Sequence, residues 1–184
     1  ISIIEDEHMK AFLDAIKGDP YEIALYITVF TGLRQGKLLG LTWDCVDFEH
    51  NLLLINKQHN RVRMEHTYRF SSLKNDKARV LTASQHVMDR LREQRAIQAR
   101  WAKAAAYAWR NKDNLVFTDE LGGFIKNKIL YMHFKKAAEQ IGQSNLRFHA
   151  LRHTYAVNSL RAGDDIGKRI AQQQADDGGD DREL

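Results

Sequence analysis

The chain has 184 residues, of which 43% are apolar, and its 28 Lys and Arg against 24 Asp and Glu give a formal net charge of +4. This composition is too apolar for a disordered chain, and the apolar runs are too interrupted for a membrane span. The single cysteine, Cys45, excludes an internal disulfide framework and a zinc site built from several cysteines, and it fits a reducing cytoplasm. Because the chain opens at Ile1 instead of Met, we expect it to be a fragment of a longer product.

The first part of the chain has helical periodicity. Apolar residues recur three or four positions apart over 4–16, with acidic residues in the first turn, and Gly18-Asp19-Pro20 follows as a stop signal. We therefore predict a helix over 4–16. A more apolar helix over 21–33, buried on most sides, and a short helix over about 35–40 are predicted next.

The pattern then changes to short strands separated by polar turns, at 46–48, 52–56, 68–73 and 78–81. We interpret these segments as a small antiparallel meander with a three-stranded sheet. Ser84 is a favourable N-cap for a long helix that is predicted to run towards Trp109.

A short apolar strand or loop at 115–117 precedes two further predicted helices, at 126–141 and 149–162. The expected fold class is therefore α+β and mainly helical. We place the folded domain at residues 1–163 and interpret residues 164–184 as an atypical polar and acidic tail.

Charge is distributed unevenly along the chain. Residues 1–56 carry a net charge of −5, residues 57–103 a net charge of +8, and residues 104–184 a net charge of +1. Within the last section, residues 164–184 hold 7 acidic and 3 basic side chains. The basic centre favours a polyanionic partner, of which nucleic acid is the commonest, although a solvated face rich in lysine and arginine is the alternative.

Two motifs in the first half contain cations suited to binding phosphate. In Thr31-Gly32-Leu33-Arg34 a buried helix ends and another begins, so Arg34 would stand on a short, rigid connection. The alternative is that Arg34 caps the preceding helix by meeting its free carbonyls. A polar turn between two expected strands presents Lys74 and Lys77 at a hairpin tip, which is alternatively an ordinary charged hairpin.

The third motif is His149-Ala150-Leu151-Arg152-His153-Thr154. In a helix, His149 and Arg152 stand three positions apart and share one face. An arginine can grip two phosphate oxygens, and an imidazole can donate or accept a proton near neutral pH. The alternative is a satisfied histidine beside a solvated arginine.

Taken in order, the three motifs resemble those of the catalytic domain of tyrosine recombinases, the phage integrase family, over residues 1–163. The run Leu39-Gly40-Leu41-x-Trp43-x-x-Val46-Asp47 also resembles the family's continuation after its first arginine. The resemblance implies the family's catalytic-domain fold, with the N-terminal DNA-binding domains absent from this chain.

The resemblance also implies a reaction. A tyrosine hydroxyl attacks a DNA phosphodiester, which leaves a 3′-phosphotyrosyl link and a free 5′-hydroxyl, and a 5′-hydroxyl of a partner strand reverses the step. Arg34 and Arg152 would neutralise the phosphate oxygens, Lys74 would donate a proton to the departing 5′-oxygen, and His149 would hydrogen-bond the phosphate and assist proton movement. No metal and no cofactor is implied.

The implied partners are double-stranded DNA and, in the full-length parent, further copies that form a tetramer on DNA; no membrane is involved. The basic centre supplies the expected DNA-binding residues, which are Lys57, Arg61, Arg63, Lys77 and Arg79.

The sequence departs from the family in two places. Lys37 stands where the family has an acidic or small residue, and a lysine there would repel Arg34. Counted from Arg152, the family's later histidine and its nucleophilic tyrosine fall at Ala175 and Leu184, and no tyrosine follows Tyr155. We interpret Tyr155 and Tyr131 as packing residues, and we expect the chain as written not to cleave DNA.

Two other interpretations stay open. The chain could be a DNA-binding remnant of a recombinase that occupies sites without cutting them. More distantly, it could be an RNA- or phosphate-binding helical domain in which Trp101, Tyr107 and Trp109 stack on bases, although aromatic residues at helical spacing are more often core.

Overall fold

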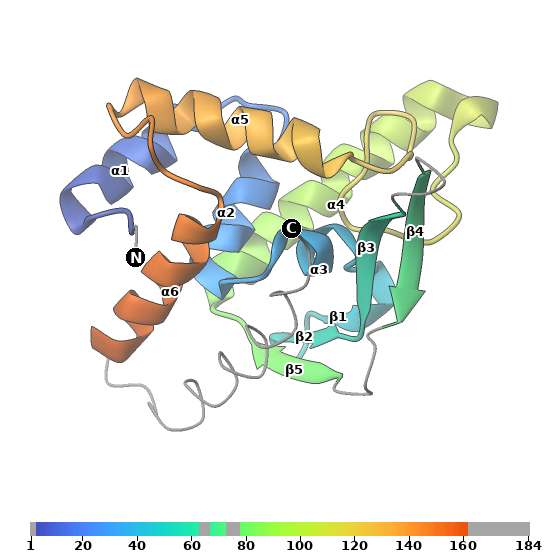
Figure 1. The fold of residues 1–184 in the computed structure, drawn as a ribbon. Coiled ribbons are helices and arrows are strands. Elements are labelled where there is room, and N and C mark those ends of the chain that lie inside the picture. The colour runs from blue at the N-terminus through green and yellow to red at the C-terminus, as the bar shows by residue number, and fades with distance from the viewer. Residues whose placement is uncertain (1–2, 63–66, 73–77, 162–184) are drawn as a thin grey trace.

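The computed structural model describes residues 3–62, 67–72 and 78–161, with the backbone alone at 60–62 and 67–72. As the sequence predicts, the fold is α+β and mainly helical (Figure 1). Its α-helices are α1 (Asp6–Ala15), α2 (Glu22–Thr31), α3 (Gln35–Leu39), α4 (Gln85–Ala105), α5 (Asn127–Gln140) and α6 (His149–Arg161). Its strands are β1 (Val46–Asp47), β2 (Leu52–Ile55), β3 (Lys57–Val62), β4 (Thr67–Ser72) and β5 (Arg79–Thr82), and two 3-10 turns are η1 (Trp43–Cys45) and η3 (Ala106–Ala108).

Helix α2 lies at the centre of the molecule because its surface is apolar on nearly all sides. Ile23, Leu25 and Ile27 are at most 5% exposed. The helix contacts α3, α4 and α6, while α1 packs against α5 (Figure 1). The prediction of a helix buried on most sides is confirmed, and α3 and α6, which carry or adjoin the arginine motifs, contact this helix directly.

The predicted three-stranded antiparallel sheet is confirmed, with the order β1-β2-β5. Its central strand places Leu53 opposite both Val46 and Leu81. All three side chains are buried, Leu53 completely. This sheet therefore closes one side of the core by apolar cross-strand pairs.

The prediction of a meander is wrong. Strand β4 pairs with β3 in a separate two-stranded sheet, and β5 returns to pair with β2. Strands β4 and β5, which flank residues 73–77, thus belong to different sheets and do not pair with each other, and the predicted hairpin tip with Lys74 and Lys77 lies outside the described residues. Strand β3 was missed because its sequence, Lys-Gln-His-Asn-Arg-Val, lacks the apolar alternation that marks a strand.

Close backbone packing joins the β3–β4 sheet to α3. A Cβ atom added at Gly40, which follows α3, would lie 2.7 Å from the Cα atom of Gln58 in β3. Only a glycine allows the strand to approach the end of the helix so closely. The position of β3 relative to α3 is therefore set by this contact.

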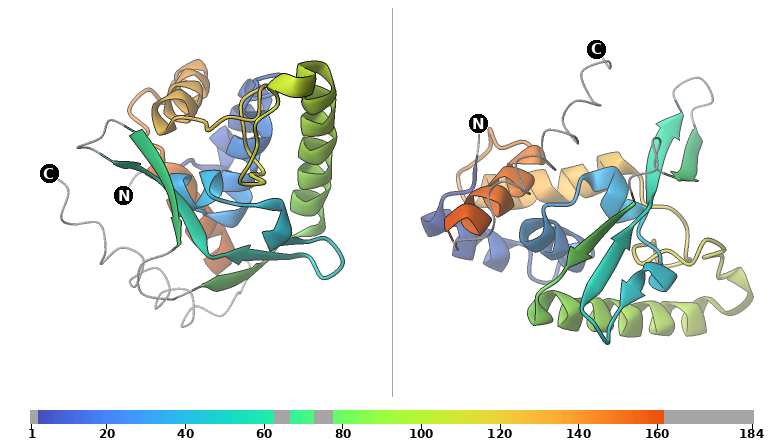
Figure 2. Two further views of the ribbon diagram at one scale, coloured as in Figure 1. Left: turned by 90° about the vertical axis from the view of Figure 1, so that its right-hand side faces the viewer. Right: turned by 90° about the horizontal axis from the view of Figure 1, so that it is seen from below.

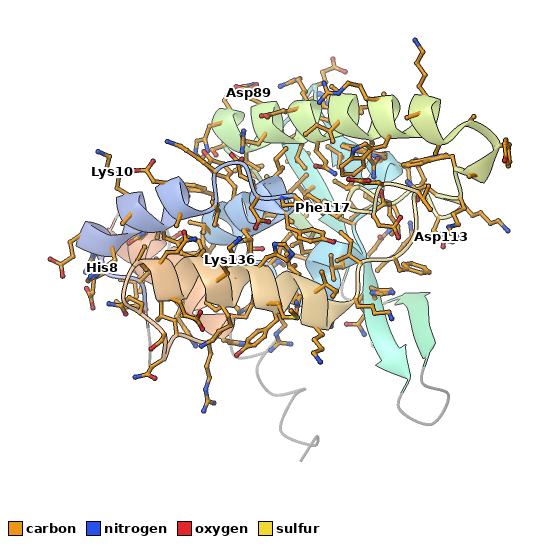
Figure 3. All side chains as sticks on the ribbon, turned by 90° about the horizontal axis from the view of Figure 1, so that it is seen from above. His8, Lys10, Asp89, Asp113, Phe117 and Lys136 are labelled. Atoms are coloured by element: carbon orange, nitrogen blue, oxygen red, sulfur yellow. The ribbon has the colours of Figure 1, made fainter. Side chains whose placement is uncertain are left out.

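Helix α4 runs along the side of the molecule away from the β3–β4 hairpin (Figure 2, right). It ends at Ala105, earlier than predicted, and Ala106 has a positive φ of 48°. The predicted apolar segment at 115–117 lies buried beside α4, with Phe117 in the interior (Figure 3).

Buried glutamines on α4 hold that segment. Gln98 donates to the carbonyl oxygens of Leu115 and Val116 and to the Thr118 hydroxyl, each at 3.0 Å, and it accepts from the Trp43 indole at 2.8 Å. Gln94 donates to the Val116 carbonyl at 3.0 Å. Together with Asn111, which donates to the Leu115 carbonyl at 2.9 Å, these bonds satisfy the buried backbone carbonyls of the segment.

Candidate functional site: a cationic pocket between α3, α6 and β3

Gly32 positions Arg34. Gly32 ends α2 in the left-handed region, with φ of 62°, and a Cβ atom at this position would lie 2.5 Å from Cδ1 of Tyr155. Arg34 follows as the extended N-cap of α3. The arginine therefore leaves a connection that is fixed by a glycine turn on one side and by the start of a helix on the other.

Arg152 is 5% exposed on the core side of α6. Its Nη1 donates to the carbonyl oxygen of Gly32 at 3.0 Å, which joins α6 to the end of α2. Burial of a guanidinium is costly unless the group is hydrogen-bonded, so this contact holds the side chain in one place. The carbonyl at the end of α2 is thus met by Arg152, a role that the sequence interpretation offered to Arg34.

His149 is the first residue of α6 and is exposed, with its ring centroid 5.5 Å from that of His153. The three predicted catalytic residues Arg34, His149 and Arg152 line one pocket of about 290 Å³. The remaining lining residues are Leu33, Gln35, Gly36, Lys37, Gln58, Asn127 and Phe148. Lys74, the fourth predicted catalytic residue, lies outside the described residues.

The electrostatics of the pocket suit an anion. Arg34, Lys37 and Arg152 contribute guanidinium and ammonium groups, and no carboxylate is found among the described lining residues. Asn127 and His149 are the first residues of α5 and α6, so the amino ends of two longer helices meet at the pocket wall. The backbone dipoles at these ends add positive potential to that of the side chains.

The sequence did not predict the side-chain amides that line the pocket, which belong to Gln35, Gln58 and Asn127. Gln35 donates from Nε2 to the backbone carbonyl of Asn127 at 2.6 Å, which ties α3 to the start of α5. Gln58 comes from β3, a strand that was not predicted. No sequence pattern marks Gln58 or Asn127, because they reach the pocket only through packing of distant elements.

The predicted DNA-binding residues with described side chains, Lys57 and Arg79, are not among the described residues that line the pocket. Lys57 donates from Nζ to the Thr42 hydroxyl at 3.2 Å and lies 3.6 Å from the Asp44 carboxylate, so it rests against η1. The hydrogen bond from Thr42 is the main cause of a lowered pKa of Asp44, and Lys57 adds to the shift. In the strands, Arg61 pairs through its backbone with Tyr68, and Arg79 pairs through its backbone with Ile55. Arg63 and Lys77 lie outside the described residues.

The two tyrosines interpreted as packing residues are not part of the pocket lining. Tyr155 is half-buried, with its ring against Gly32. Tyr131 lies on α5, with its ring centroid 6.3 Å from that of Phe134. Tyr107 is fully exposed beyond the end of α4. Within the part of the chain that the structure describes, the pocket therefore contains no tyrosine hydroxyl.

Across residues 3–62, 67–72 and 78–161, no group of three or more His, Cys, Asp or Glu side chains could hold a metal ion. In the same residues, no helix has the length and apolar character needed to cross a membrane.

Comparison with known proteins identifies the family. The profile of the phage integrase family matches residues 3–174. The chain belongs to the phage integrase family. A tyrosine recombinase XerC-like protein of Caldanaerobacter subterraneus subsp. tengcongensis is 30% identical to this integrase-family chain over 173 residues, which cover 89% of the chain and 44% of that relative. The chain thus spans less than half the length of the curated relative it matches.

Solved structures show the same fold. The Tn1549 transposon integrase in complex with circular intermediate DNA has a TM-score of 0.71 at 20% identity, covering 89% of this chain and 55% of that one. The XerA recombinase has a TM-score of 0.65 at 17% identity, covering 90% of this chain and 53% of that one. The predicted tyrosine-recombinase catalytic-domain fold is confirmed for this integrase-family chain.

Proposed function

We propose that this chain is the catalytic region of a site-specific DNA recombinase and that its pocket binds a phosphate of double-stranded DNA. The observation that carries the proposal is the convergence of Arg34 with His149 and Arg152 in one pocket. These residues come from separate motifs at the two ends of the described chain. Two arginines beside a histidine, without a carboxylate among the described lining residues, suit a phosphodiester.

In the proposed reaction of the full-length parent, a tyrosine oxygen attacks the phosphorus and the bond from phosphorus to the 5′-oxygen breaks. Arg34 and Arg152 would stabilise the negative charge that develops on the two non-bridging oxygens. His149, which is exposed and lines the pocket, would hydrogen-bond the phosphate and assist proton movement. Lys74 would donate the proton that the departing 5′-oxygen takes up.

We propose that the 184-residue chain binds DNA without cleaving it. The tyrosine is the group that forms the covalent link, and none of the described tyrosine hydroxyls is in the pocket lining. Tyr155 is unsuited to the task because its ring packs on Gly32 as part of the α2–α6 contact. In the parent we propose a tetramer on two DNA duplexes, working in the cytoplasm.

Binding is tested with a fluorescent duplex by anisotropy over a series of salt concentrations. We expect the logarithm of the affinity to fall linearly with the logarithm of salt concentration, as it does when phosphates displace counterions. Arg34→Gln should weaken binding by about 10- to 150-fold, because a charge-assisted hydrogen bond contributes about 1.5–3 kcal/mol. Lys10→Gln, an exposed cation on α1, is the matched control and should bind as the unmodified chain does.

Unchanged binding by Arg34→Gln, in a variant whose thermal unfolding is also unchanged, would contradict the proposed phosphate pocket. An RNA duplex that binds as tightly as DNA would favour the interpretation as an RNA-binding domain. Cleavage is tested separately with nicked half-site duplexes, on which we expect no covalent protein–DNA product.

A further inference from the structure

Positive charge also gathers where α4 ends. Residues 100–112, which we call the α4 tip, comprise the last turns of this helix, η3 and the segment that follows. Four exposed cations belong to the tip: Arg100, Lys103, Arg110 and Lys112. The tip has no acidic residue, and Asp113 follows it. Within the part of the chain that the structure describes, these four cations form no ion pair, whereas Arg90 and Arg92 in the first half of α4 pair with carboxylates.

The α4 tip is separate from the pocket. None of the described residues that line the pocket belongs to the tip. Helix α4 packs against α2 and runs along the side of the molecule away from the β3–β4 hairpin, whose strand β3 contributes Gln58 to the pocket (Figure 2, right). The tip and the pocket are therefore two distinct places at which a polyanion can bind.

Tyr107 lies within the tip with its ring in solvent. It is 101% exposed, whereas Val80, the next most exposed large apolar residue of the described chain, is 59% exposed. Trp101 and Trp109 are half-buried, and a Cβ atom at Gly122 would lie 3.1 Å from Cδ2 of Trp109. The indole of Trp109 therefore packs on the body of the protein, while the ring of Tyr107 is accessible over its whole surface. Packing of the core does not explain Tyr107.

The backbone on both sides of Tyr107 is held in place. Ala106, which precedes it, has φ of 48° and ψ of −120°, a conformation that residues other than glycine rarely adopt. The N–H group of Ala106 donates to the carbonyl oxygen of Ala102 in α4. On the other side, the N–H group of Arg110 donates to the carbonyl oxygen of Leu121 at 3.0 Å. The turn therefore presents the ring from a fixed position.

An accessible ring among cations suits a nucleic-acid strand whose bases are unpaired. A base can stack on the ring while lysine and arginine contact the phosphates on either side. In a duplex, neighbouring base pairs cover the faces of each base, so a ring on the protein surface does not reach them. A protein partner fits less well, because the cores of protein interfaces are depleted in lysine and the exposed residues next to Tyr107 are the small Ala104, Ala106 and Ala108.

We propose that the α4 tip is a second binding site, which takes single-stranded nucleic acid with a base stacked on Tyr107. Lys103, one helical turn before Tyr107, and Arg110, three residues after it, contact the adjacent phosphates. The site acts by binding alone and takes no part in bond making. It does not depend on the proposed function of the pocket.

The test measures binding of a fluorescent oligothymidylate of about 12 nucleotides by anisotropy, with oligouridylate of the same length in parallel. Tyr107→Ala should weaken binding about 5- to 150-fold, because stacking on the ring is lost, whereas Tyr107→Phe should keep the affinity. Lys103→Gln should reduce the slope of log affinity against log salt by about 0.7, the value for one phosphate contact of a single strand. The oligonucleotide that binds more tightly identifies the strand as DNA or RNA.

The matched control for charge is Lys10→Gln, because Lys10 and the end of the tip at Asp113 lie at opposite ends of the molecule (Figure 3). This variant should bind the oligonucleotide with an unchanged salt slope. A second control measures the duplex, for which Tyr107→Ala should leave the affinity unchanged. Thermal unfolding of Tyr107→Ala should also be unchanged, since the ring is exposed.

The variants separate this site from the pocket. If Arg34→Gln weakens binding of the oligonucleotide and Tyr107→Ala does not, the strand is bound at the pocket and the tip site is refuted, while the phosphate pocket stands. If Arg34→Gln leaves duplex binding unchanged but Tyr107→Ala weakens oligonucleotide binding, the pocket proposal fails and the tip site stands. The tip site is also overturned if neither oligonucleotide binds, or if Tyr107→Ala weakens duplex binding as much as oligonucleotide binding.

Discussion

Arg152 donates a hydrogen bond to the carbonyl oxygen of Gly32, 120 residues earlier in the chain, at 3.0 Å. The same glycine is covered by the ring of Tyr155, one turn further along α6. One turn of α6 thus both closes the end of α2 and places a guanidinium in the pocket. The same turn of α6 therefore contributes both to the stability of the fold and to the cationic pocket.

Replacement of Gly32 tests that junction. Gly32→Ala adds a Cβ atom at 2.5 Å from the Tyr155 ring and places alanine at φ of 62°. We expect a loss of about 2–5 kcal/mol in the free energy of unfolding by urea, from the left-handed backbone and the steric overlap together. Gly18→Ala is the matched control, because Gly18 has φ of 76° and no atom within 4 Å of the added Cβ.

Gly18→Ala should lose only the backbone part, about 1–2 kcal/mol. Combining Gly32→Ala with Tyr155→Ala should cost less than the sum of the two single changes, because the overlap is then removed. Equal losses for Gly18→Ala and Gly32→Ala would show that the Tyr155 contact is unimportant.

Replacement of Gly40 tests whether its close contact with Gln58 sets the position of β3. Gly40 has φ of −91°, which any residue adopts, so Gly40→Ala should act through the 2.7 Å approach to the Gln58 Cα atom alone. We expect about 1–3 kcal/mol of destabilisation and weaker DNA binding, because Gln58 lines the pocket. Gly142→Ala, with no atom within 4 Å of the added Cβ, should lose stability through its φ of 72° without weakening DNA binding. Unchanged DNA affinity in a folded Gly40→Ala protein would contradict this account.

Replacement of Gln98 tests the hydrogen bonds that the buried glutamines of α4 make to residues 115–118. Gln98→Ala removes the donor to the Leu115 and Val116 carbonyls and to the Thr118 hydroxyl. We expect a loss of about 1–3 kcal/mol in urea unfolding, because the Trp43 indole N–H loses its acceptor, while the Leu115 and Val116 carbonyls keep Asn111 and Gln94 as donors. Gln85→Ala makes the same change at an exposed position of α4 and should cost about 0.5 kcal/mol or less. Similar losses for both would show that the network contributes little.

The buried imidazole of His59 should make the free energy of unfolding depend on pH. The ring is 1% exposed and stacks on Phe124 with centroids 4.4 Å apart, and burial lowers the pKa of His59 below its ordinary value of 6.5. The folded state therefore favours the neutral ring, and the unfolded chain takes up the proton first. The contribution of the neutral His59 ring to the free energy of unfolding is fully present above about pH 6.5, and it is lost as the pH falls through the folded-state pKa.

The measurement is the urea midpoint at about pH 7.5 and at about pH 5.5, for the unmodified chain and for His59→Phe. We expect a smaller fall in the midpoint for His59→Phe, which keeps an aromatic ring against Phe124 and removes the titrating group. An identical fall in both proteins would assign the pH dependence to other groups.

The helices were predictable because each presents its own pattern. Helix α2 is apolar throughout, and α5 begins and ends within one residue of the predicted limits. Strand β3 was not predictable, since its side chains are mostly polar and its place depends on the contact with Gly40. The pairing of β5 with β2 was missed for a related reason: neighbouring segments in the sequence were assumed to be neighbours in the sheet.

The sequence by itself determined the order of the elements, the family motifs and the identity of Arg34, His149 and Arg152 as candidate site residues. These properties depend on residue type and local spacing, which are present in the chain before it folds. Only the tertiary structure decided that these three residues share a pocket, that Lys57 rests against η1 and that Lys37, Gln58 and Asn127 join the site. Such contacts depend on how α3, β3, α5 and α6 pack against one another, and packing between distant elements leaves no periodic signal in the sequence.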